Sequence, residues 1–246
     1  MKQYLHAFAM CQSMFCAIPF PARIWDEKAR DRMLLFLPLV GLEIGFLWAA
    51  LGWLCQWLNL KEMVTALAMT VFPFAATGFL HLDGFMDVTD AIGSCRSLER
   101  RREILKDSHV GAFAVIGIVL LALSQFAFFC AAAGTGDFRI FLFVPAVSRC
   151  CSALAVTALR PMSTSQYAAR KKRTSHMVVL SIMALCLTAA GFLLWGRQGL
   201  VLLGCVAGYG LALRKAYRSL DGMNGDISGF CLTIGELYAV LVWAVL

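Results

Sequence analysis

Long apolar runs separated by short polar segments dominate this chain of 246 residues. Each run approaches the roughly 20 residues that an α-helix needs to cross the hydrocarbon core of a bilayer. The pattern therefore predicts an all-α fold, a polytopic membrane bundle of about seven helices that forms a single domain over residues 1–246. The expected spans are 34–57, 62–82, 110–133, 139–159, 177–195, 199–217 and 227–246.

The N-terminal stretch MKQYLHAFAMCQSMFCAIPF is apolar enough to be mistaken for a secretory signal. Its apolar run is interrupted by His6, Gln12 and Ser13, and no A-x-A-like cleavage site follows. We expect an interfacial helix here, one that lies along the membrane surface.

Composition agrees with a membrane protein. The chain is 60% hydrophobic and only 15% charged, whereas soluble domains carry about 25% charged residues. None of the ten cysteines forms a CxxC pair, which excludes the usual zinc and disulfide patterns and predicts small buried side chains. The net charge of +7 comes without any nucleic-acid-binding motif, so we expect no nucleic-acid partner.

The basic residues are distributed unequally between the two sides of the predicted bundle. Most of the 22 Lys and Arg residues lie before the first span or in the segments after the second, fourth and sixth spans. The other side holds only Lys61, Arg139 and Arg197, and Arg149 falls inside a span. The positive-inside rule then places the N-terminus in the cytoplasm and the C-terminus outside.

Three aspartates, Asp83, Asp87 and Asp90, follow the second span at the spacing i, i+4, i+7. On a helix continuing from that span they would share one face. Carboxylates on one face repel one another unless a cation lies among them, and hard oxygen ligands suit Mg²⁺. The alternative is a solvated acidic helix end.

The next loop combines basic and acidic residues. Ser97 is a candidate N-cap for a short helix over 98–107. Arg100, its neighbouring arginines and Lys106 could bind phosphate, or could form a salt-bridged surface helix. Asp107 is a candidate functional residue because it precedes the re-entry of the chain into the membrane.

The segment DGMNGDISG precedes the last span. Its glycines allow close approach to a ligand, and a helix entered near Ile227 can offer N–H groups to phosphate. Glu236, inside the last span, is a functional candidate by its position in the membrane, although pairing with Arg149 would account for both residues.

Carboxylates, basic residues and a Gly-rich turn together indicate chemistry on a diphosphate, with Mg²⁺ neutralising phosphate oxygens. No Ser-His or Cys-His pair is evident, so direct attack by an acceptor hydroxyl is expected. His81 or one of the aspartates would take the proton.

The motifs GFLHLDGFMDVTDAIG, ERRREILKDSHVGAFAV and GMNGDISGF occur in that order and resemble the cobalamin synthase family of adenosylcobinamide-GDP ribazoletransferases. Similarity extends from about residue 15 to residue 236. The acidic positions of the family pattern are all present. The chain departs from that pattern at positions usually occupied by smaller or different residues, namely Phe79, Ala91, Ala114, Asp221, Asn224 and Phe230.

The resemblance implies that the 3′-hydroxyl of α-ribazole, or of its 5′-phosphate, attacks the cobinamide-linked phosphorus of adenosylcobinamide-GDP and releases GMP. It implies a Mg²⁺ cofactor. The expected metal ligands are Asp83, Asp87, Asp90 and Asp226, with the catalytic residues drawn from Asp83, Asp87, Asp90 and His81. The expected substrate-binding residues are Arg100, Lys106, Asp107, Ser108, Gly222, Asn224 and Gly225.

The resemblance also implies a multi-pass protein of the bacterial cytoplasmic membrane with its active site on the cytoplasmic face. The expected partners are the two substrates and the lipid bilayer. A homo-oligomer, or association with other enzymes of corrinoid metabolism, is left open.

Two other classes of function compete with this interpretation. A CDP-alcohol or prenyl phosphotransferase also combines aspartates, Mg²⁺ and a diphosphate. However, the chain has no D-x-x-D-G-x-x-A-R run, and its second acidic site would have to be Asp107 or Asp226. A transporter or channel would place acids near the bilayer midplane, whereas here they gather at one interface.

Overall fold

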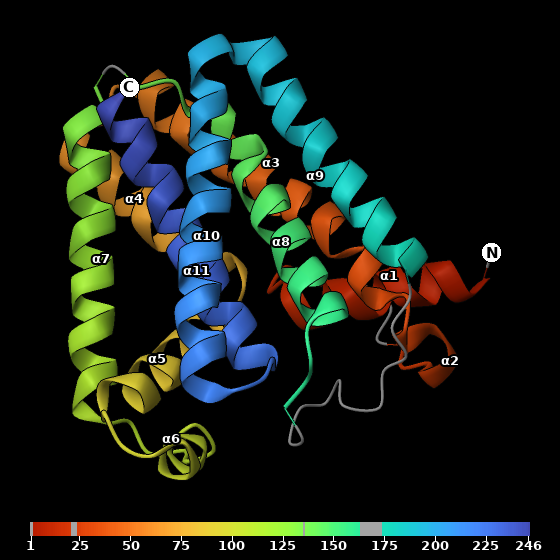
Figure 1. The fold of residues 1–246 in the computed structure, drawn as a ribbon. Coiled ribbons are helices and arrows are strands. Elements are labelled where there is room, and N and C mark those ends of the chain that lie inside the picture. The colour runs from red at the N-terminus through yellow and green to blue at the C-terminus, as the bar shows by residue number, and fades with distance from the viewer. Residues whose placement is uncertain (1, 21–23, 135, 163–173) are drawn as a thin grey trace.

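The computed structural model describes residues 2–20, 24–134, 136–162 and 174–246, and these residues form helices without a strand (Figure 1). This confirms the predicted all-α fold. Four of the basic residues in the segment after the fourth predicted span, Arg170, Lys171, Lys172 and Arg173, lie outside the described residues. The helices are α1 (Lys2–Phe15), α2 (Glu27–Arg30), η1 (Met33–Leu35), α3 (Leu37–Trp57), α4 (Glu62–Ala76), α5 (Leu80–Gly93), α6 (Leu98–Ile104), α7 (Ala112–Ala132), η2 (Phe138–Leu142), α8 (Val144–Ala158), α9 (Thr174–Trp195), η3 (Gly196–Gln198), α10 (Gly199–Leu220) and α11 (Gly225–Val245).

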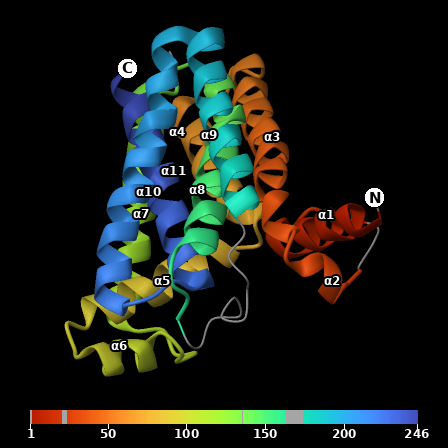
Figure 2. The same ribbon diagram turned by 45° about the vertical axis from the view of Figure 1, so that its right-hand side comes forward.

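The long helices α3, α7, α8, α9, α10 and α11 form a bundle, and shorter helices gather at one of its ends (Figure 1). That end holds α2, α5, α6 and the turn between α10 and α11. Helix α1 lies across the same end, and the C-terminus lies at the opposite end (Figure 2). That α1 lies along a membrane surface stays a prediction. All ten cysteines are free.

Five stretches of the described residues are long and apolar enough to cross a membrane, and a bent helix pair would make a sixth. The stretch Thr174–Leu220 contains two helices, α9 and α10, which run side by side and are joined by η3 (Figures 1 and 2). A multi-pass membrane protein is therefore supported, whereas the number of seven spans stays a prediction. The stretches are Met33–Trp57, Ala112–Ala132, Phe138–Ala158, Thr174–Leu220 and Gly225–Val245, and the bent pair is Glu62–Ala76 with Leu80–Gly93.

The three aspartates of α5 do not lie on a straight continuation of the second predicted span. The prediction of a single helix running through residues 62–82 into the aspartate motif was wrong, because the chain bends before the motif. Helix α4 ends at Ala76, and α5 leaves it at an angle of 91°. Gly78 and Phe79 both have positive φ, at 58° and 62°, and such left-handed residues terminate a right-handed helix. The hydroxyl of Thr77 donates to the carbonyls of Pro73 and Phe74, which stabilises the end of α4.

Phe79 is one of the positions where the sequence departs from the family pattern, which has glycine there. A left-handed conformation costs a residue with a Cβ about 1–2 kcal/mol, and the Phe79 side chain is 54% exposed. We expect Phe79→Gly to be more stable than Phe79→Ala, by about 1 kcal/mol. Both variants lose the same ring contacts, so thermal unfolding of the pair in detergent isolates the backbone effect. Equal melting temperatures would contradict the prediction.

Candidate active site

Helix α5 packs directly against the first turns of α11, and glycines make this close approach possible. A Cβ added to Gly84 would lie 2.9 Å from the Cα of Asp226, which is closer than side chains tolerate. One added to Gly229 would lie 3.1 Å from the carbonyl oxygen of His81. Substituents at these two positions would push the helices apart, so the glycines hold Asp226 beside the aspartates of α5.

The four acidic side chains form one electrostatic cluster. Asp83, Asp87 and Asp90 lie on one helix as predicted, and Asp226 lies in the first turn of α11. Asp83, Asp90 and Asp226 all act electrostatically on Asp87, which is partly buried. A cation placed here would relieve their mutual repulsion.

A polar cavity of about 260 Å³ adjoins the cluster. The three α5 aspartates line it together with the segment after α6, including Lys106, Asp107 and Ser108. The predicted metal ligands of α5 and three predicted substrate residues therefore share one cavity. His109 and Gly111, which were not singled out from the sequence, also line it.

Two residues of this cavity are held by specific contacts. A Cβ added to Gly111 would meet the carboxylate of Asp90, so a larger residue there would displace that carboxylate from its position. The ring of His109 lies 2.6 Å, Nδ1 to Oδ1, from Asp107, and this hydrogen bond lowers the pKa of the Asp107 carboxyl. The carboxylate form of Asp107 is thus stabilised at the cavity wall.

A second, largely apolar cavity of about 240 Å³ is lined by residues of α1, η1, α3, α5, α8 and α11. Phe15, His81 and Val156 belong to its wall, with Gly225 and Asp226 from the start of α11. Among the described residues, Asp83 alone lines both cavities. The two cavities therefore meet at the first aspartate of the motif.

No group of three or more His, Cys, Asp or Glu side chains within the described ranges has an arrangement that could hold a metal ion. The donor set is nevertheless the one that suits Mg²⁺, because the four cluster side chains are all carboxylates. Mg²⁺ in proteins usually keeps waters and binds one or two carboxylates plus substrate phosphates. A preformed three-residue cage is therefore not a requirement for this ion.

Other predicted residues lie away from the cavities. Arg100 is exposed and pairs with Glu103 at 2.6 Å. Its neighbour Arg102 donates to the carbonyls of Leu220 and Asp221, at the C-terminal end of α10, where cations are favoured. Of the two alternatives for this segment, phosphate binding or a salt-bridged surface helix, the second therefore applies to Arg100 and Arg102. Ser97 caps α6 as predicted, but the helix ends at Ile104 instead of continuing to Asp107.

The Gly-rich turn has a structural role at several positions. Helix α11 begins at Gly225, two residues before the predicted Ile227, because Asn224 caps it by accepting from the Ile227 N–H. Asn224 also donates to Asp226 at 2.7 Å, which orients a cluster carboxylate. Gly222 has a φ of 154° and packs on Met162, and it lines neither cavity.

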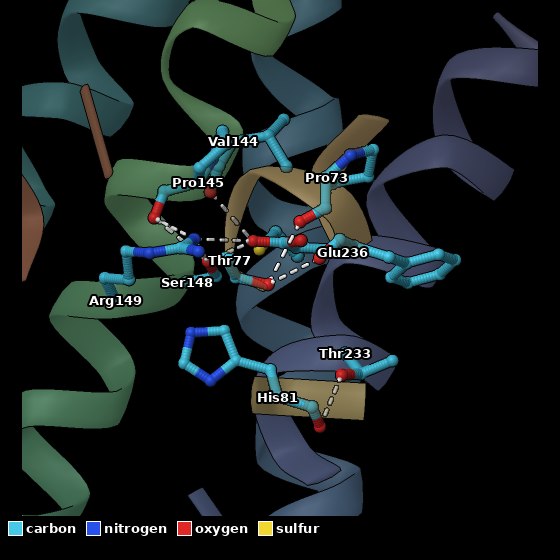
Figure 3. Close-up of polar contacts among 11 residues, drawn as sticks. Pro73, Thr77, His81, Val144, Pro145, Ser148, Arg149, Thr233 and Glu236 are labelled. Carbon is cyan, nitrogen blue, oxygen red and sulfur yellow. Dashed lines mark hydrogen bonds and ion pairs between the residues drawn. The ribbon is translucent and has the colours of Figure 1, made fainter. Parts of the chain in front are cut away.

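A buried ion pair lies beside His81, one of the residues that line the apolar cavity (Figure 3). Nη1 of Arg149 lies 2.8 Å from Oε1 of Glu236, and the side chains are 1% and 9% exposed. The hydroxyl of Ser148 donates to the same carboxylate oxygen. The suggested pairing of Arg149 with Glu236 is confirmed. The His81 ring lies beside this network (Figure 3), and its Nε2 is buried without a partner among the described side chains.

Sequence reasoning missed several residues of the apolar cavity. Phe15 ends the N-terminal helix, and its ring stacks on His81 with centroids 6.2 Å apart. Ser152 and Ser228, from α8 and α11, both line the cavity and share a hydrogen bond of 2.5 Å. Serines within apolar spans are the feature of the sequence that could have indicated a polar site here. Whether two such serines come into contact depends on how the spans pack, which the sequence pattern does not specify.

Comparison with known proteins places this geometry in a family. The profile of the family described as cobalamin-5-phosphate synthase matches residues 7–244. The chain belongs to the cobalamin-5-phosphate synthase family. No solved structure matches it.

Relatives of the same family are similar over nearly their whole length. An adenosylcobinamide-GDP ribazoletransferase of Clostridium perfringens (strain SM101 / Type A) is 35% identical over 100% of both chains. One of Clostridium botulinum (strain Alaska E43 / Type E3) is 34% identical over 96% of each. One of Lachnoclostridium phytofermentans is 32% identical over 97% of this chain and 93% of the relative. The resemblance drawn from the motifs is confirmed.

The departures from the family motifs lie mainly outside the two cavities. Ala91, on α5, is fully buried in the hydrophobic core. The ring of Phe230 stacks on that of Phe85, with centroids 5.6 Å apart. Asp221 is the left-handed C-cap of α10. Ala114 is the departure that lines the polar cavity.

Proposed function

We propose that this member of the cobalamin-5-phosphate synthase family is an adenosylcobinamide-GDP ribazoletransferase. The 3′-hydroxyl of α-ribazole, or of its 5′-phosphate, attacks the cobinamide-linked phosphorus. The bond from that phosphorus to the bridging oxygen breaks, and GMP leaves. The products are adenosylcobalamin or its 5′-phosphate. The observation that supports this most is the meeting of two cavities, one polar and one apolar, at Asp83 of the family motif.

The aspartate cluster would hold Mg²⁺ through carboxylates drawn from Asp83, Asp87, Asp90 and Asp226, and the bound ion would neutralise charge on the diphosphate oxygens. The carboxylates would have to turn toward a common point, since they do not form a ready metal site as they lie. Lys106 and Ser108 line the same cavity and would bind phosphate oxygens.

Either Asp83 or His81 could accept the proton of the attacking hydroxyl, since both line the apolar cavity. We favour Asp83 because it also lines the cavity that would hold the diphosphate. A base must be within hydrogen-bonding reach of the hydroxyl as it attacks phosphorus, and Asp83, which lines both cavities, would be near both substrates.

We further propose a bacterial cytoplasmic-membrane location, with the N-terminus and the active site on the cytoplasmic side. The cluster, α6 and α1 lie at one end of the bundle, and the C-terminus lies at the other (Figures 1 and 2). Basic residues of the sequence concentrate in the segments expected at the active-site end, as the positive-inside rule requires of a cytoplasmic face.

The proposed function is tested by GMP release. Membranes containing the protein are given adenosylcobinamide-GDP, α-ribazole 5′-phosphate and Mg²⁺, and we expect GMP and the coupled corrinoid in equal amounts. Chelation of divalent cations should stop the reaction, and adding back Mg²⁺ should restore it. GMP release no greater than that of membranes from cells with an empty vector would overturn the proposal.

A further inference from the structure

Neither lysine nor arginine is among the described residues that line the apolar cavity. Its described lining side chains are mostly carbon, from Phe15, Leu34, Leu37 and Val156, with a few polar groups among them. A diphosphate would be poorly accommodated here, because a charged group removed from water needs a compensating partner. The polar cavity, in contrast, contains Lys106 and the aspartate cluster. The two cavities therefore suit different parts of the reactants.

Size limits the occupant further. Cavities for drug-sized ligands are about 300–1,000 Å³, and this one is about 240 Å³. It is too small for a corrin macrocycle but large enough for a bicyclic aromatic base. The base of α-ribazole, a planar benzimidazole, is of this size.

The wall also offers specific contacts to such a base. The rings of Phe15 and His81 are nearly parallel, with an interplanar angle of 18°, and provide flat aromatic surface. Planar rings gain favourable offset-stacked or edge contacts with aromatic side chains. Nε2 of His81 is a buried polar atom without a partner among the described residues, and an unsatisfied buried polar group is costly, so a ring nitrogen of a ligand brought within reach of it would be stabilising.

We propose that the apolar cavity binds the benzimidazole base of α-ribazole, so that the ribose 3′-hydroxyl reaches Asp83 where the two cavities meet. His81 would hydrogen-bond a ring nitrogen of the base and thus position the acceptor. This inference rests on the proposed function, whose diphosphate it assigns to the polar cavity. The corrinoid would lie outside both cavities.

The test narrows the apolar cavity. Purified full-length Val156→Phe is assayed with each substrate varied in turn. We expect the KM for α-ribazole to rise at least about 10-fold, the effect of a misfitted group in an apolar pocket. The KM for adenosylcobinamide-GDP should not change. The KM for a riboside of imidazole, whose base is smaller, should rise less in this variant than the KM for α-ribazole.

The matched control is Val119→Phe, the same substitution at a 49% exposed position on α7 that lines neither cavity. It should behave as the wild type does. If Val156→Phe does not fold, Val156→Leu replaces it in the test, because leucine enlarges the side chain by less. The KM for α-ribazole should then also rise. An unchanged KM for α-ribazole in the folded variant, or a rise confined to adenosylcobinamide-GDP, would overturn the assignment.

A second readout separates this inference from the reaction itself. The benzimidazole fluorescence of α-ribazole is titrated with wild-type protein in the absence of the corrinoid substrate. Binding by the wild type that is weakened by Val156→Phe supports the cavity assignment even if no GMP is released. Turnover by the wild type, with fluorescence binding unaffected by Val156→Phe, would leave the proposed function standing and refute the cavity assignment.

Discussion

Asp83→Asn is expected to lower the rate of GMP release by about 10²–10⁴-fold, the range for loss of a general acid–base group. The substitution keeps the shape of the side chain and removes its charge. Asp83 lines both cavities, so the variant would lose the proposed proton acceptor and one of the proposed Mg²⁺ ligands together. The measurement is GMP formation at saturating concentrations of both substrates and of Mg²⁺.

The matched control is Asp137→Asn, at the opposite end of the bundle. Asp137 accepts from the Arg139 N–H at 2.9 Å, which asparagine can also do, so activity should be retained. Membrane insertion and thermal unfolding of Asp83→Asn should match the wild type, because Asp83 is exposed. Near-normal turnover by Asp83→Asn would remove this residue from both proposed roles.

The sequence is most informative about features with a local cause. Apolar runs of sufficient length predict the helices, and Ser97 and the spacing of Asp83, Asp87 and Asp90 predict local geometry that the structure confirms. The bend between α4 and α5 was missed because Phe79 adopts a left-handed conformation that its residue type disfavours. There the tertiary structure overrides the local preference.

The cavities depend on contacts between distant segments, which no local pattern encodes. The apolar cavity needs Phe15 of α1, Ser152 of α8 and Ser228 of α11 to meet. Similarly, the hydrogen bond of Arg102 to the carbonyl of Leu220 depends on the packing of α6 at the end of α10. An arginine that binds a helix terminus and one that binds a phosphate look alike in sequence.

The buried ion pair is expected to produce the largest stability effect among single substitutions. Arg149→Met would leave the Glu236 carboxylate buried with only the Ser148 hydroxyl as a side-chain partner. Breaking one side of a buried pair costs about 3–5 kcal/mol, because the remaining charge is uncompensated. Unfolding of the purified protein in mixed detergent micelles, followed by tryptophan fluorescence, would measure the loss of stability.

The double variant Arg149→Met with Glu236→Met separates the buried charge from the lost packing. It should recover most of the stability lost by Arg149→Met, since replacing a whole buried pair by apolar side chains is often neutral or stabilising. Arg197→Met, at an exposed arginine of η3, should change stability by no more than about 0.5 kcal/mol. Additive losses in the double variant would show that Arg149 and Glu236 contribute independently, and the pair would then have no energetic coupling to explain its burial.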